Sequence, residues 1–185
     1  MNHHLNINHA NPIHPDPLET LKQEHHSTLQ RLDMIERTLQ YLESLPSRTA
    51  LKRCKVEQAR LRDWVNELYE RLSRHFLMEE EVLFPVLAEY IGKEHGPIEV
   101  MVQEHANITS ELANWKSAVS ELCKLAGPAR DAVLKVATGA GYRTIAQLRL
   151  HISKEDQILF KICEVSLSEE EKKLVFKKLQ AIESH

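Results

Sequence analysis

Apolar residues recur every three or four positions along most of this chain, which is the spacing of one face of an α-helix. The first such stripe follows Asp16 and Pro17, a pair that is typical of a helix start. It stops before a turn at residues 44–47. Its apolar members are Leu18, Leu21, Leu29, Leu32, Ile35, Leu39 and Leu42. The pattern predicts a long first helix that buries one face.

Three more long helices are predicted in the same way. The second begins near Ala50 and carries apolar residues as far as Ile91, although Pro85 is expected to kink or end it. The third lies between breaks at residues 92–97 and 127–128, and the fourth runs from there to Val165. Their stripes contain Leu61, Val65, Leu68, Leu72, Val82 and Val86, then Ile98, Met101, Ile108, Leu112, Trp115, Val119 and Leu122, then Val133, Val136, Ala140, Leu148, Ile158, Ile162 and Val165. Gly139 and Gly141 weaken the fourth helix locally without stopping it.

A short fifth helix is predicted at the end of the chain. Ser168 is followed by Glu169, Glu170 and Glu171, the pattern of a capping box, and the helix should end near Ser184. Four long amphipathic helices with short connections predict an all-α, up-down-up-down four-helix bundle with this extra C-terminal helix. We expect one bundle domain over residues 16–185, preceded by a flexible, His- and Asn-rich tail over residues 1–15.

Composition narrows the class of protein. A length of 185 residues suits one domain, and five glycines with 5% aromatic residues fit helices better than a sheet of many turns. The 24 basic and 27 acidic side chains are mixed, which argues against a nucleic-acid partner. No apolar run reaches the roughly 18 residues that a membrane span needs, and the first fifteen residues do not form a secretory signal. Three widely spaced cysteines form no disulfide framework, so a cytoplasmic location is expected.

Each of the four apolar stripes is interrupted by polar residues on its inward face. Steps of three and four residues keep these positions in line with their apolar neighbours. The first and third stripes each contain one histidine, and the second and fourth each contain a histidine with a glutamate four positions later. The residues are His25, His75, Glu79, His105, His151 and Glu155. The core of the bundle should therefore hold four imidazoles and two carboxylates.

Two explanations fit buried carboxylates in such a core. An unpaired buried carboxylate costs several kcal/mol or must take up a proton. A buried His–Glu hydrogen-bond network is one explanation, and a metal site whose cations supply the missing positive charge is the other. The recurrence of polar breaks on all four helices favours the metal site. Imidazole nitrogens together with carboxylate oxygens suit iron, manganese or zinc.

The candidate ligands also belong to an internal repeat. The triplet Gln-Glu-His ends at His25 and again at His105, and the pattern H-x-x-x-E-[ED]-x-[VI]-L-F begins at His75 and again at His151. The chain is therefore predicted to be two helical hairpins of one design, related by an approximate two-fold axis. With one bridging carboxylate from each half, the site would hold two metal ions. Each ion would have two histidines and share both carboxylates, which leaves room for a solvent bridge and an added ligand.

These motifs resemble those of the hemerythrin family, and more closely its bacterial hemerythrin-like (HHE cation-binding) branch. The resemblance covers roughly residues 18–183 through LKQEHHSTL, HFLMEEEVLFPVL, GPIEVMVQEHANI and HISKEDQILF, followed by LSEEEKKLVFKKLQAIE. It implies a non-haem centre of two iron ions with an oxo or hydroxo bridge. It implies further that Glu79 and Glu155 bridge the irons, and that the four histidines are terminal ligands.

One position departs from the oxygen-carrying hemerythrins, which have a second histidine one turn beyond the ligand on the third helix. Here that position is Thr109. This departure argues against reversible oxygen carriage and favours nitric oxide, peroxide or redox chemistry. We therefore expect a cytoplasmic di-iron protein that binds or senses a small ligand (oxygen, nitric oxide or peroxide), with no membrane or nucleic-acid partner.

Three other functions stay open at this point. One is an enzyme that consumes peroxide or nitric oxide at the same irons, although no separate proton donor can be identified. Another is an iron-centre repair or iron-handling protein, although such members of the family usually carry an extra N-terminal cysteine domain, which this sequence does not show. The third is a structural or regulatory module in which metal mainly stabilises the bundle.

The remaining candidates are weaker. His26 is turned about 100° from His25 on a helix, which predicts a surface position or one just outside the ligand set. We expect His95 to lie in a loop and the histidines near the two ends of the chain to be incidental: His3, His4, His9, His14 and His185. Four acidic residues next to the ligands could either bond an imidazole or be solvated: Glu24, Glu80, Glu104 and Asp156.

Overall fold

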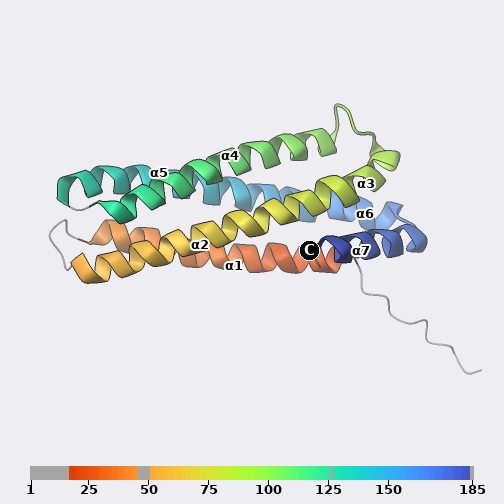
Figure 1. Ribbon diagram of the computed structural model, residues 1–185. Helices are drawn as coiled ribbons and strands as arrows, with labels where there is room; N and C mark the ends of the chain where they lie inside the picture. The colour runs from red at the N-terminus through yellow and green to blue at the C-terminus, as the bar shows by residue number, and fades with distance from the viewer. Residues whose placement is uncertain (1–16, 46–50, 126, 184–185) are drawn as a thin grey trace, which may run out of the picture.

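The computed structural model describes residues 17–45, 51–125 and 127–183. Four helices of 28 residues each run alternately in opposite directions and form the predicted all-α bundle (Figure 1): α1 (Pro17–Ser44), α2 (Leu51–Met78), α4 (Pro97–Lys124) and α5 (Gly127–Lys154). Each long helix packs against two of the others, so the four enclose a common core. The predicted tail, the N-cap at Asp16 and the start of the second helix near Ala50 lie outside the described residues.

The second and fourth long helices each contain one π-helical turn. η1 (Glu79–Leu83) joins α2 to α3 (Phe84–Ile91), and η2 (Glu155–Leu159) joins α5 to α6 (Phe160–Ser166). In each, the amide of the phenylalanine that follows the turn bonds the carbonyl of the glutamate five residues earlier. Pro85, which has no amide hydrogen, falls just after the first turn and does not end the helix, which continues to Ile91. π turns of this kind are often found at functional sites.

The π turns change which side chains face the core, and part of the predicted apolar stripe is wrong for this reason. One extra residue per turn rotates everything after it by about 100°. Leu159 is buried while the predicted Ile158 is 48% exposed, and Val165 is 84% exposed. The π turn does not account for the predicted Val136, which lies before it in α5 and is exposed, while Leu134 and Ala137 are buried instead.

Two apolar clusters fill the bundle, and the polar residues of interest lie between them. The larger cluster occupies the part around Trp115 and Gly141, where α5 comes so close to its neighbours that a Cβ on Gly141 would lie 2.7–2.9 Å from Leu39 and Trp115 atoms. The second cluster joins the start of α1 and the segments after the π turns to the C-terminal helix. A centre placed between these clusters is shielded from water on both sides.

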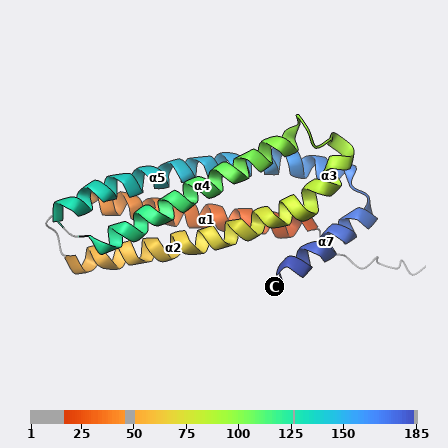
Figure 2. The same cartoon turned by 45° about the horizontal axis from the view of Figure 1, so that its top comes forward.

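The C-terminal helix α7 (Glu169–Glu183) closes the end of the bundle that carries the second cluster. It lies beside η1 and α1 (Figures 1 and 2) and buries Val175 and Leu179. The predicted capping box is confirmed: Ser168 N donates to Oε2 of Glu171 at 2.8 Å, and the amide of Glu171 donates to the Ser168 hydroxyl at 3.3 Å. None of the helices in the described ranges is long and apolar enough to cross a membrane.

Candidate metal centre

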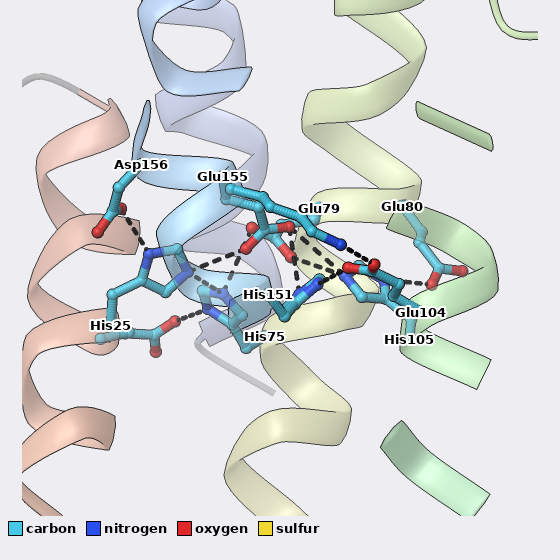
Figure 3. A network of polar contacts seen from close by, with 11 residues as sticks. His25, His75, Glu79, Glu80, Glu104, His105, His151, Glu155 and Asp156 are labelled. Atoms are coloured by element: carbon cyan, nitrogen blue, oxygen red, sulfur yellow. Dashed lines mark hydrogen bonds and ion pairs between the residues drawn. The ribbon is translucent and has the colours of Figure 1, made fainter. Parts of the chain in front are cut away.

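The structure brings all six predicted residues together at one level of the bundle (Figure 3). They come from the four long helices and from the first residue of each π turn, and each is at most 4% exposed: His25, His75, Glu79, His105, His151 and Glu155. Two overlapping groups of four have ligand atoms within 4.8 Å of one another, and Glu79 and Glu155 belong to both groups. The first group adds His25 and His75, and the second adds His105 and His151.

Each of the two glutamates faces histidines of both groups. Glu79 oxygens lie 3.4 Å from Nε2 of His75 and 3.4 Å from Nε2 of His105. Glu155 oxygens lie 3.2 Å from Nε2 of His25 and 3.4 Å from Nε2 of His151. A metal ion bonded at about 2.1 Å holds its ligand atoms about 3 Å or more apart, so these separations suit atoms that surround an ion.

Six polar atoms at this centre have no hydrogen-bond partner, although they are fully buried. Among the described residues they are both carboxylate oxygens of Glu79 and of Glu155, and Nε2 of His105 and of His151. Buried polar groups are nearly always satisfied, and an ionised carboxylate without a partner is especially costly. The donor set therefore fits cations of the kind that bind imidazole and carboxylate together.

The opposite nitrogen of every imidazole bonds a carboxylate at the outside of the centre. Nδ1 lies 2.8 Å from Asp156 in His25, 2.6 Å from Glu24 in His75, 2.6 Å from Glu80 in His105 and 3.1 Å from Glu104 in His151. These four acidic residues were left open between two roles by the sequence, and the structure assigns them to hydrogen bonding with the imidazoles. We call them the outer carboxylates: Glu24, Glu80, Glu104 and Asp156.

The outer carboxylates fix which way each imidazole presents its lone pair. A carboxylate only accepts, so Nδ1 must carry the hydrogen, and in a neutral ring Nε2 is then a bare acceptor that points to the centre. Nε2 of His25 and Nε2 of His75 consequently face each other at 3.0 Å. Two acceptors in this position need a cation or a proton between them. Such carboxylate–imidazole pairs also orient metal-bound histidines and raise their basicity.

The pKa values of the buried groups also show that the centre favours positive charge. Burial lowers the pKa of His75, but Glu79 and the hydrogen bond to Glu24 raise it further, to about 10. Burial likewise lowers the pKa of His105, and Glu155 and Glu79 bring it up to about 9. Burial raises the pKa of Glu79, yet the adjacent His75 and His105 hold it well below its usual range. Without metal, protons on His75 and His105 thus take the place of cations.

Aromatic rings cover the centre on both sides of the approximate two-fold axis. Phe160 stacks on His25 with ring centroids 5.2 Å apart, and its repeat equivalent Phe84 stacks on His105 at 5.7 Å. The halves differ at Phe76, which stacks on His105 at 3.9 Å and whose repeat equivalent is Ile152. Beside Phe76, a cavity of about 390 Å³ between α2 and α4 reaches His105 and Thr109.

The other candidate histidines do not join the centre. His26 is exposed and lies 2.9 Å from the Gln30 amide, one turn further along α1. His95 is 91% exposed in the connection before α4, where its φ of 58° is the only positive value among the non-glycine residues described. The predicted tail histidines and His185 lie outside the described residues.

The sequence profile of one family, the hemerythrin HHE cation binding domain, matches residues 16–163. The chain belongs to this family. The match contains all six buried residues and all four outer carboxylates, and it confirms the family resemblance and the four-helix bundle that this resemblance implied.

Several curated proteins are similar to part of the chain. The iron-sulfur cluster repair protein YtfE of Salmonella typhimurium is 31% identical over 103 residues, which are 54% of this chain and 45% of that protein. The proteins of the same name from Salmonella paratyphi B and Salmonella newport are 30% identical over the same shares. The matched part thus spans less than half the length of these relatives.

Proposed function

We propose that this protein binds two non-haem iron ions, with His25 and His75 at one ion, His105 and His151 at the other, and Glu79 and Glu155 bridging both. The observation that carries the proposal is the set of six fully buried carboxylate and imidazole atoms that have no hydrogen-bond partner. When bound, the two irons would supply redox chemistry and coordination positions for an added ligand.

The residues of the chain have distinct tasks in this proposal. The outer carboxylates hold each Nδ1–H and thereby turn each Nε2 toward the centre. The two apolar clusters and the stacked phenylalanines exclude water, which strengthens the attraction between cations and the buried carboxylates. The π turns place each bridging glutamate at the point where its helix is locally widened.

Metal analysis tests whether the protein binds two iron ions. Protein made in iron-rich medium should contain close to two irons per chain, and His75→Ala should lower this content. His26→Ala is the matched control, because His26 is the next residue of α1 and is exposed to solvent. Wild-type protein with well under one iron per chain, after anaerobic loading, would overturn the proposal.

Beyond iron binding, we infer that the protein handles iron for the repair of iron–sulfur centres in the cytoplasm. The similar Salmonella proteins are named iron-sulfur cluster repair proteins, which supports this role. The three cysteines are free thiols, as a reducing compartment favours. Iron-loaded protein should restore activity to an oxidatively damaged iron–sulfur enzyme faster than His75→Ala does. Equal rates with the two proteins would contradict a role of the centre in repair.

A second candidate, the binding of a small ligand such as oxygen, nitric oxide or peroxide, is favoured by the cavity beside His105. Its walls include Phe76, Leu77 and Val102, and Thr109 leaves space where the oxygen carriers have a further histidine. Anaerobic titration of the reduced, loaded protein with oxygen and nitric oxide should then change its optical spectrum. Consumption of peroxide or nitric oxide that exceeds that of His75→Ala would instead make the protein an enzyme.

A further inference from the structure

The approximate two-fold symmetry of the centre is broken by one charged side chain. The repeat that aligns His75 with His151 also aligns Met78 with Lys154. Met78 is fully buried in the second apolar cluster, whereas Lys154 is one-third exposed and its ammonium bonds Glu104. One half of the centre therefore has a lysine where the other has an uncharged thioether.

The lysine contacts the outer carboxylate that holds His151. Oε2 of Glu104 lies 3.1 Å from Nδ1 of His151, while the equivalent Glu24 lies 2.6 Å from Nδ1 of His75. Within the described ranges, no lysine or arginine nitrogen lies within 4 Å of the carboxylate of any other outer residue: Glu24, Glu80 or Asp156. Among the described residues, three imidazoles thus bond a carboxylate that no lysine or arginine contacts, and the fourth bonds one that also contacts an ammonium.

This difference has a direct consequence for the imidazole. A carboxylate that accepts the Nδ1–H pushes electron density into the ring and makes Nε2 a better donor. An ammonium on the same carboxylate withdraws that charge and competes for its lone pairs. Nε2 of His151 is consequently the poorest donor of the four, and the ammonium adds repulsion toward a cation close by.

We propose that Lys154 makes the two metal positions unequal, so that the position formed by Glu79, His105, His151 and Glu155 binds a divalent cation more weakly than the one formed by His25, His75, Glu79 and Glu155. This inference rests on the proposed two-metal centre. It makes the weaker position the last to fill and the first to lose its ion, which is the behaviour that a protein donating iron requires.

Titration of the metal-free full chain with Co²⁺, followed by its visible absorption and by calorimetry, tests the inference. Wild-type protein should bind two ions in two resolved steps. Lys154→Met introduces the residue found at the equivalent position of the other half, Met78. It should lower the dissociation constant of the weaker step by about tenfold, within the usual range for partners of a metal-bound histidine. His151→Ala should remove the weaker step and leave the tighter one, and His75→Ala should do the reverse.

Two further variants separate the charge from other effects. Lys154→Arg keeps the cation and should behave like wild type. Lys22→Met is the matched control, since Lys22 is also 33% exposed and bonds a carboxylate, that of Glu164, which holds no imidazole. Phe76 and Ile152, which also differ between the halves, stay unchanged in all these proteins. Thermal unfolding of each metal-free variant verifies that it is folded.

The outcomes distinguish this inference from the proposed function. Two steps with equal constants in wild type, or two steps that Lys154→Met leaves unchanged, overturn the inference while the two-metal centre stands. Binding of fewer than two ions by wild-type protein overturns the two-metal centre itself, and the inference with it. A tightened weaker step in Lys154→Met, with wild-type behaviour in Lys154→Arg and Lys22→Met, supports the inference.

Discussion

Nδ1 of His105 lies 2.6 Å from Oε1 of Glu80, a carboxylate on the neighbouring η1 turn that directly follows the buried Glu79. One turn of the chain thus supplies both a carboxylate for the centre and the hydrogen bond that orients an imidazole from α4. The repeat produces the same relationship between Asp156 and His25. Placement of the proposed metal ligands and of their orienting groups is therefore coupled through the two π turns.

Replacement of Glu80 tests this coupling. Glu80→Gln keeps a possible acceptor but removes the charge that makes Nε2 of His105 a strong donor, so metal affinity should fall about 10- to 100-fold. Competition with a chelator of known affinity measures the change. Glu81→Gln is the control, because Glu81 is the exposed next residue of the same turn and should leave affinity unaltered. A loss of affinity in both variants would contradict the specific role of Glu80.

Metal removal should lower the stability of the folded chain, because the cations offset two buried carboxylates. A ligand that binds only the folded state stabilises it by about 2.7 kcal/mol when its free concentration is about 100 times its dissociation constant. Thermal unfolding with added Fe²⁺ and with a chelator should differ accordingly. Glu79→Gln, which removes a carboxylate shared by both groups of ligands, should reduce this difference, and His26→Ala should preserve it. Equal unfolding temperatures with and without metal would favour the alternative of a His–Glu hydrogen-bond network.

The sequence was sufficient for the bundle and for the residues at its centre. Helical periodicity is a long-range pattern, so the breaks at His25 and His105 stand out against many apolar neighbours. The capping box at Ser168 and Glu171 could also be predicted, because it depends only on residues close together in the sequence. That the buried residues hold metal stays a prediction, although the structure brings them together.

Other features of the centre depend on packing between helices and could not be predicted from the sequence. Whether Glu80 bonds an imidazole or faces solvent depends on where α4 lies, so the sequence left both roles open. Composition does not reveal the π turns, so a regular helical period predicts Ile158 in the core, whereas the structure buries Leu159. The repeat also contains a difference that bears on the centre: Met78 and Lys154 occupy equivalent positions beside the candidate ligands.

Two glycines of α5 give a matched test of the close packing near Trp115. Gly139→Ala places a Cβ in ordinary contact, 3.6 Å from an Arg143 nitrogen, and should stabilise the helix by up to about 1 kcal/mol through its higher helix propensity. A Cβ on Gly141 would lie 2.7 Å from Leu39 Cδ1 and 2.8 Å from the Trp115 ring. Gly141→Ala should therefore destabilise by about 1–3 kcal/mol, as overpacked cores do. Urea unfolding measures both, and a gain of stability in Gly141→Ala would show that α5 can move away from its neighbours.

Tyr142 joins α5 to α1 through a hydrogen bond that its hydroxyl donates to Glu43 at 2.9 Å. Partial burial and the Glu43 carboxylate raise its pKa to about 12, because both disfavour the phenolate. The stabilising contribution of this group is thus complete below about pH 10, the ordinary value for tyrosine, and is lost as the pH rises through about 12. Phenolate absorbance should show a late ionisation that Tyr142→Phe removes and that Glu43→Gln moves back toward about pH 10. An unchanged late ionisation in Tyr142→Phe would assign it to another tyrosine and would contradict the Glu43 contact.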